Sequence, residues 1–134
     1  MKAILIEDGK PKIVEGTNKY LIDFSKGFLG SDITIERVYL SSNQTLVMCV
    51  DEDGLSKKLP LNFFMEMNNP FYPIQAIVGK ALIVRVDELD YSKGELWDYE
   101  VTDVTDEDIA KIDRLLDEDY LVDLALKFHK KNLY

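Results

Sequence analysis

The chain has 134 residues, of which 46% are hydrophobic and 31% charged, and its net charge is −9 at pH 7. These proportions are typical of a globular domain and not of a disordered chain, so we expect one domain over 1–134. The excess of acidic residues argues against direct binding of DNA or RNA, whose phosphates are bound by clustered Lys and Arg.

The sequence also argues against a membrane protein and a disulfide scaffold. No apolar run approaches the roughly 20 residues that span a bilayer. The single cysteine, Cys49, cannot form an internal disulfide, which agrees with a reducing compartment. Because Met1 leads directly into a strand-like AILI without a cleavage signal, we expect a cytoplasmic protein that makes no membrane contact.

The first predicted element is a β-hairpin. The apolar runs KAILIE and KIVEG flank Asp8-Gly9-Lys10-Pro11, and a turn dipeptide between two such runs is a short-range hairpin signal. Pro11 cannot donate a ladder hydrogen bond, so it belongs in the turn or on an edge.

Aromatic and apolar residues at helical spacing then predict a short helix near Tyr20 to Gly27. The segment ITIERVYL predicts a strand with one face better buried than the other.

The centre of the sheet is expected within residues 45–86. TLVMCV is apolar in succession, which predicts a strand covered on both faces, with Cys49 as a small buried hydrophobe rather than a reactive thiol. The run AIVGKALIVRV predicts a second apolar strand. Gly79 interrupts that run and marks a bulge or a close backbone approach.

A candidate pocket lies between these strands, in the run LPLNFFM. Pro60 and Asn62 interrupt strand periodicity there, and Phe63 and Phe64 follow immediately. Aromatic residues at this density can line a binding groove, so these four residues form the candidate pocket. The more ordinary interpretation is a short element that plugs one end of the core.

The C-terminal part is predicted to be helical. An acidic segment with Tyr91, Trp97 and Tyr99 leads to it as a loop or hairpin that covers the sheet edge. Thr105 starts a helix whose apolar stripe is Ile109, Ile112, Leu115 and Leu116. After a break near 117–119, a second helix has two stripes, one of Leu121, Leu124, Ala125 and Phe128 and one of Val122 and Leu126. A helix apolar on two sides needs two partners, so Val122 and Leu126 are a candidate self-association stripe for a homodimer.

Three carboxylates form a candidate partner surface. Asp106, Asp113 and Asp117 are seven and eleven positions apart, so on one continuous helix they share a face beside the apolar stripe. Such a row can imitate DNA phosphates and occupy a nucleic-acid-binding cleft, which would make the protein an acidic DNA mimic in counter-defence. An ordinary solvated helix face is the alternative.

Together these elements predict an α+β fold. We expect a mainly antiparallel sheet of about five to seven strands, one short N-terminal helix and a C-terminal helical pair. Residues 1–101 would form the sheet-rich core and residues 102–134 the helical segment. The short turn-rich connections favour hairpins over crossovers.

Five segments resemble a known family of small domains. They are MKAILIEDGKPKIVE, MCVDEDG, LPLN, IVGKALIV and VTDEDI. The chain is similar in them to the uncharacterised domain of unknown function three-eight-four-six, which is typical of phages, plasmids and other bacterial mobile elements. The family pattern has arginine where this chain has Phe63, and threonine where it has Lys80. The resemblance implies a mobile-element accessory protein in a bacterial cytoplasm and supplies no catalytic residue.

Catalytic machinery is not apparent in the sequence. His129 is the only histidine and falls near the end of the last predicted helix, where a general base is hard to hold in place. We therefore expect a non-enzymatic module, without a cofactor, that binds or inhibits a host protein. A small-molecule binder, such as a nucleotide sponge with its pocket near 60–67, is the alternative. An enzyme using paired carboxylates and a divalent metal is a third hypothesis.

Overall fold

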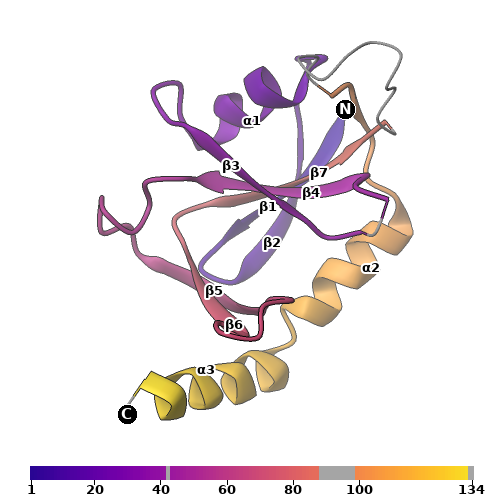
Figure 1. Ribbon diagram of the computed structural model, residues 1–134. Coiled ribbons are helices and arrows are strands. Elements are labelled where there is room, and N and C mark those ends of the chain that lie inside the picture. Colours follow the sequence, from indigo (N-terminus) through magenta and orange to yellow (C-terminus); the bar gives the residue numbers. More distant parts are fainter. Residues whose placement is uncertain (42, 88–98, 133–134) are drawn as a thin grey trace.

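The computed structural model describes residues 1–41, 43–87 and 99–132. Within them the fold is α+β with antiparallel sheets, a short N-terminal helix and a C-terminal helical pair, as predicted (Figure 1). The strands are β1 (Lys2–Glu7), β2 (Lys10–Glu15), β3 (Ile35–Tyr39), β4 (Leu46–Asp51), β5 (Leu61–Glu66), β6 (Ile74–Val78), β7 (Ala81–Val86) and β8 (Val101–Thr102). The helices are α1 (Leu21–Leu29), α2 (Asp106–Leu115) and α3 (Glu118–Asn132).

The main sheet has the order β2-β1-β7-β4-β3, and β8 pairs with β7. The predicted hairpin is confirmed as β1–β2, whose turn residues Asp8 and Gly9 have φ angles of 51° and 70°. Positive φ at both central residues is the backbone of the tight hairpin turn that Asp-Gly favours. Pro11 lies in β2, an edge strand of this sheet, where its missing N–H costs no ladder bond.

Both faces of the main sheet are covered, as the unbroken apolar run of β4 predicts. Residues 46–50 are all buried, including Cys49. On one face α1 packs through Leu21 and Phe24, and on the other lie α2 and the β5–β6 hairpin. In the edge strand β3, Ile35 packs on the α1 side of the sheet and Val38 on the side of α2 and the β5–β6 hairpin. The expectation that one face of β3 is better buried is therefore wrong, because each face of this edge strand has one partly buried apolar residue and its other residues are exposed.

The predicted strand over 76–86 is in fact two strands in two sheets. Gly79 separates β6 from β7 with a φ of +72°, a backbone conformation that glycine adopts readily. A Cβ at this position would lie 2.8 Å from Leu59 Cδ1. This close contact at Gly79 is with a side chain and not with another backbone segment, and the glycine marks a turn between sheets and not a bulge within one strand. The main sheet has six strands, within the predicted range of five to seven, and β5 and β6 form a second, two-stranded sheet.

Residues 61–65 of the LPLNFFM run lie in the short strand β5, and Phe63 and Phe64 are buried there, which agrees with the interpretation as a short element that closes the core. β5 pairs with β6 in a two-stranded sheet that lies between the main sheet and α3 (Figure 1). Phe63 joins the core under the main sheet, while the Phe64 ring lies 4.8 Å from that of Phe128 in α3. Because both faces of β5 are covered, its apolar residues follow one another without alternation.

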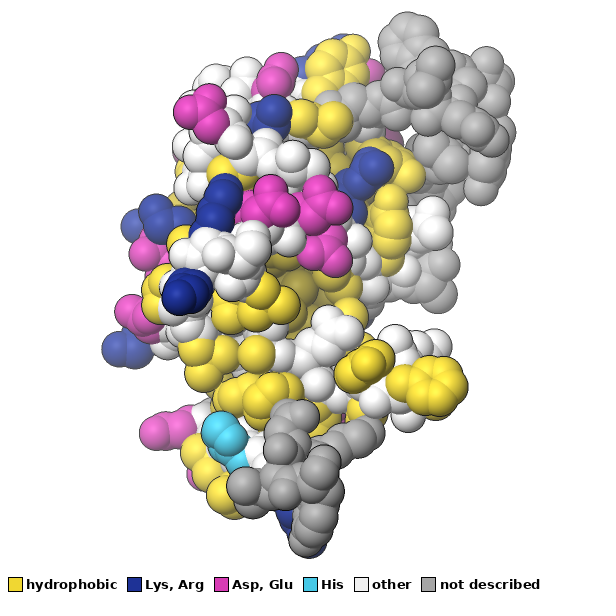
Figure 2. All heavy atoms as spheres, turned by 60° about the vertical axis from the view of Figure 1, so that its left-hand side comes forward, with side chains coloured by type: hydrophobic (Ala, Val, Ile, Leu, Met, Phe, Trp, Pro, Cys, Tyr) yellow, Lys and Arg dark blue, Asp and Glu magenta, His cyan; other side chains and the backbone are white. Residues whose placement is uncertain are grey.

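The C-terminal helices begin where the sequence predicts. The Thr105 side chain accepts from the Asp108 backbone N–H at the start of α2. In α3, Leu124 is fully buried against the β5–β6 side, whereas Val122 and Leu126 are 55% and 66% exposed. Figure 2 shows exposed apolar side chains over the lower half of the molecule, at the height of the β5–β6 hairpin and α3. Of the predicted aromatic segment, Tyr99 packs beside the α1 layer, and Tyr91 and Trp97 lie outside the described residues.

Candidate functional site

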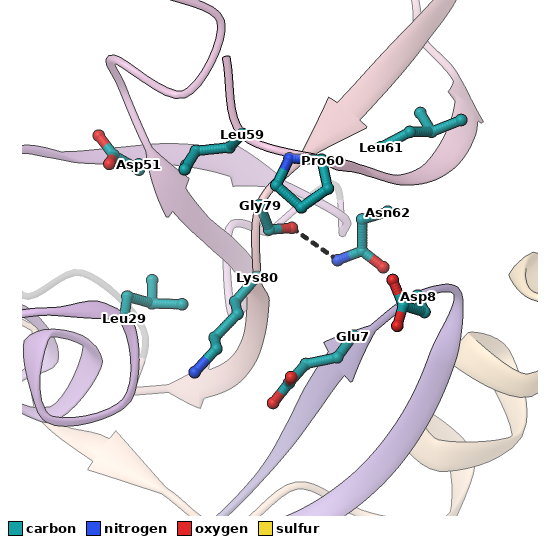
Figure 3. Close-up of a pocket in the computed structure, with 10 residues that line it drawn as sticks. All are labelled: Glu7, Asp8, Leu29, Asp51, Leu59, Pro60, Leu61, Asn62, Gly79 and Lys80. Atoms are coloured by element: carbon teal, nitrogen blue, oxygen red, sulfur yellow. Dashed lines mark hydrogen bonds between the residues drawn. The ribbon is translucent and has the colours of Figure 1, made fainter. Parts of the chain in front are cut away.

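A pocket of about 360 Å³ lies between the β1–β2 turn, the end of α1 and the start of β5. Pro60 and Asn62 of the predicted pocket line it, but Phe63 and Phe64 do not, because they are used in the packing of β5. Figure 3 shows the remaining walls. They are Glu7, Asp8, Leu29, Asp51, Leu59, Leu61, Gly79 and Lys80.

Asn62 ties three segments of backbone together at the edge of this pocket. Its Nδ2 donates to the carbonyl oxygens of Ile6 and Gly79, each at 2.8 Å, and its Oδ1 accepts from the Gly9 N–H at 2.8 Å. The bond to Gly79 is visible in Figure 3. A buried amide with three such bonds has at most one free position, so Asn62 is a structural clamp rather than a ligand-binding group.

The charges around the pocket are mostly negative. Glu7, Asp8 and Asp51 face one cation, Lys80, among the lining residues. Asp51 also pairs with Lys57, whose Nζ lies 2.7 Å from Oδ2, and this hydrogen bond holds the pKa of Asp51 below its usual value against the opposing effect of burial. An acid-rich rim repels phosphates, so the geometry favours a neutral or cationic ligand over a nucleotide.

A second feature is the turn from β5 to β6, which we call the aromatic turn, residues 67–73. Phe71 and Tyr72 are 78% and 67% exposed there. The turn is nevertheless ordered by hydrogen bonds: Asn69 Oδ1 accepts from the N–H groups of Phe71 at 2.9 Å and Tyr72 at 3.2 Å, and the Met67 N–H donates to Pro73 at 2.8 Å. Two large aromatic side chains are thus held outward on a preorganised turn.

In the sequence, Asn68-Asn69-Pro70 and Tyr72-Pro73 indicate a loop and nothing more specific. The available signal was the order Asn-Asn-Pro-Phe-Tyr-Pro, in which an Asx turn and two prolines fix the backbone on either side of an aromatic pair. Exposed aromatic residues on a rigid support are the side chains that anchor protein interfaces.

The predicted acidic row is shorter than expected. Asp106 and Asp113 are exposed on α2, but α2 ends at Leu115 and Asp117 lies beyond it. Asp117 instead accepts from the Tyr120 N–H at 3.1 Å and caps the start of α3. Asp113 also lines a shallow cavity of about 160 Å³ together with Lys12, a cation beside the row. The prediction that three carboxylates share one helix face is wrong, and the case for DNA mimicry loses its geometric basis.

Arg85 and Asp108 form a network that the sequence did not reveal. Arg85 Nε and Nη2 donate to the two Asp108 carboxylate oxygens at 2.7 and 2.6 Å, and Arg85 Nη1 donates to Thr45 Oγ1 at 3.3 Å. Burial acts to raise the pKa of Asp108, but the hydrogen bonds from Arg85 and Thr105 outweigh it and leave this pKa below its usual value. The signal was a lone charge within the apolar run ALIVRV. The pair joins α2 to β7 and is structural.

Cys49 and His129, the cysteine and the histidine of the chain, lie in different elements of the fold. Cys49 is fully buried in β4, and His129 is an exposed residue of α3 whose ring centroid lies 6.2 Å from that of Phe64. Within the described ranges, no cluster of three or more His, Cys, Asp or Glu is placed to hold a metal ion. No helix in the described part of the chain is long and apolar enough to cross a bilayer.

Comparison with known proteins adds no relative: no family model, no curated protein and no solved structure matches the chain. The resemblance to the mobile-element family therefore stays a prediction from the sequence.

Proposed function

We propose that the protein is a non-enzymatic module that binds a partner protein through the aromatic turn. The observation that carries this proposal is the pair Phe71 and Tyr72, which are 78% and 67% exposed on a backbone that hydrogen bonds to Asn69 hold in place. Burying aromatic side chains on a backbone that is already ordered costs less conformational entropy than burying them on an unordered loop, and aromatic residues supply much of the binding free energy at interfaces.

The charge of the chain defines the class of partner. At −9 it favours association with a basic surface, by raising the rate of productive encounter. The partner is thus expected to offer an apolar recess for two rings, with Lys or Arg around it. The resemblance to mobile-element proteins supports a bacterial host protein as this partner, and inhibition of that protein as the outcome.

Affinity purification from bacterial lysates with three baits tests the proposal. The baits are the wild type, the double variant Phe71→Ala/Tyr72→Ala, and Leu55→Ala as the control, since Leu55 is 76% exposed on a different turn. A protein retained by the wild type and the control but lost with the double variant is the expected result. Since each interface anchor contributes about 2 kcal/mol or more, affinity should fall at least 100-fold. Equal retention by all three baits would refute the proposal.

The pocket of about 360 Å³ supports a second candidate function, small-molecule binding. Its size is within the range of ligand sites, and Leu29, Leu59 and Leu61 give it apolar walls. A thermal-shift screen should compare amines and neutral nucleosides with nucleotides. A ligand at 100 times its dissociation constant adds about 2.7 kcal/mol of stability.

The pocket itself is tested by Leu61→Trp, which places a larger side chain at its wall. A ligand-induced shift seen in the wild type should disappear in this variant and persist in Leu55→Trp, because Leu55 is not among the lining residues. If no compound raises the melting temperature, or if the shift survives Leu61→Trp, the pocket is not the binding site.

A further inference from the structure

The exposed face of α3 carries acidic, apolar and basic side chains in an order that is complementary to the same face of a second helix running in the opposite direction. Asp119 lies near its N-terminal end, the exposed residues Val122 and Leu126 lie in the middle, and Lys130 lies near its C-terminal end. Leu124, on the opposite side, is fully buried against the rest of the protein. The face that these four exposed residues share, here called the α3 strip, is therefore directed away from the core.

Helix geometry places the four residues on one side. Asp119 and Lys130 are eleven residues apart, which at 3.6 residues per turn is close to three full turns and about 16 Å along the axis. Val122 and Leu126 are four residues apart and lie between them, so the strip reads acidic, apolar, basic. Asp123 and Lys127, which pair at 2.9 Å along the border of the strip, repeat the order of acidic before basic. The midpoint of the charged pair and the midpoint of the apolar pair fall within one residue of each other, at residues 124–125.

We propose that the α3 strip binds the α3 strip of a second copy of the chain in antiparallel orientation. A two-fold axis near residue 124 places Val122 of each copy beside Leu126 of the other, and Asp119 beside Lys130 at both ends. An isologous contact of this kind needs a self-complementary patch, which the strip is. The antiparallel arrangement also sets the positive end of each helix dipole next to the negative end of the other.

The charge order is the reason to assign a second copy rather than an unrelated protein. A parallel arrangement would place Asp119 beside Asp119 and Lys130 beside Lys130, so like charges exclude it. The exposed face of a helix of 15 residues, about 22 Å long, is smaller than the roughly 800 Å² per partner of a standard interface. The dimer is therefore weak and reversible, and forms at high protein concentration.

Sedimentation equilibrium of the full chain from about 10 μM to about 1 mM tests the inference. The wild type should show a concentration-dependent dimer. Leu126→Glu should weaken the dimer at least tenfold, because it places a charge at the centre of the strip, and the 66% exposure of Leu126 leaves folding unaffected. Leu55→Glu, at a residue 76% exposed elsewhere, is the matched control and should leave the dimer unchanged.

Charge reversal tests the orientation. Asp119→Lys and Lys130→Asp should each weaken the dimer, and the double variant Asp119→Lys/Lys130→Asp should restore it, since the reversed pairs are again complementary. The effects should diminish as salt is raised. A wild type that is monomeric at 1 mM would overturn the inference, as would a double variant weaker than either single variant. Circular dichroism of each variant confirms that the helix content is unchanged.

Discussion

Replacing Asp108 with alanine removes the carboxylate that joins the start of α2 to the main sheet. This carboxylate accepts two hydrogen bonds from Arg85, at 2.6 and 2.7 Å, and one from the Thr105 N–H at 2.8 Å. The side chain of Asp108 is 5% exposed and that of Arg85 is 29% exposed. The change therefore leaves a guanidinium without its partner and an unsatisfied N–H at the helix start.

Breaking a buried ion pair from one side costs about 3–5 kcal/mol. Because Arg85 retains some contact with water, the lower end applies, and we expect Asp108→Ala to lower the free energy of unfolding by about 3 kcal/mol. Urea unfolding followed by circular dichroism measures this change. Asp106→Ala is the control: Asp106 is an exposed residue of the same helical turn, so it should cost no more than about 1 kcal/mol.

The double variant Arg85→Met/Asp108→Ala separates the pair from its surroundings. Since neither charge is left alone, the double variant should be about 2 kcal/mol more stable than the sum of the single changes predicts. A loss below about 1 kcal/mol for Asp108→Ala, or a coupling below about 0.5 kcal/mol, would refute the view that this pair anchors α2.

The Arg85–Asp108 pair also makes the free energy of unfolding depend on pH. The pKa of Asp108 is lower in the folded protein than in the unfolded chain, so unfolding takes up a proton in acid. The stabilisation is complete above the unfolded pKa of about 3.9 and is lost as the pH falls through the lower folded pKa. Urea midpoints measured at intervals from neutral pH to about pH 2 should fall less steeply for Asp108→Ala than for the wild type. Identical slopes would contradict the assignment.

Three further substitutions test the packing, each by urea unfolding. Asn62→Ala leaves two carbonyls and one N–H without their partner and should cost about 2–4 kcal/mol, whereas a cost below about 1 kcal/mol would show that water replaces the clamp. Gly79→Ala combines a φ of +72° with a Cβ 2.8 Å from Leu59 Cδ1 and should cost at least about 1–2 kcal/mol, so a neutral result would refute the strain. Ser25 is fully buried, and its hydroxyl has no hydrogen-bond partner among the described residues, so Ser25→Ala should be neutral or stabilising by up to about 1 kcal/mol; a clear destabilisation would reveal a missed bond.

Local signals in the sequence were sufficient for most elements. Asp8-Gly9 between two apolar runs specified the β1–β2 hairpin, since its turn conformation depends only on those residues. Thr105 specified the start of α2, because a cap acts within three residues. The separation of the apolar stripes of α3 also followed from helical spacing, and it left Val122 and Leu126 exposed.

Contacts between distant segments decided the rest. The sequence could not show that Gly79 lies at the turn between two sheets. This turn depends on contacts with other segments, namely the Leu59 side chain and the hydrogen bond from Asn62. The sequence also could not show that both faces of β5 are covered, because one cover is the main sheet and the other is α3, more than fifty residues later.

The candidate sites were also predictable only in part. Pro60 and Asn62 were identified from sequence as pocket residues, but their neighbours Glu7, Asp8 and Lys80 come from other strands and turns, and these decide the charge of the pocket. The charge of −9, the separate stripe of Val122 and Leu126 and the hairpin turn follow from sequence alone, since composition and local spacing determine them. The outward direction of the aromatic turn and the partner of Arg85 required the tertiary structure, because each depends on which distant backbone and side chains the fold brings within hydrogen-bonding distance.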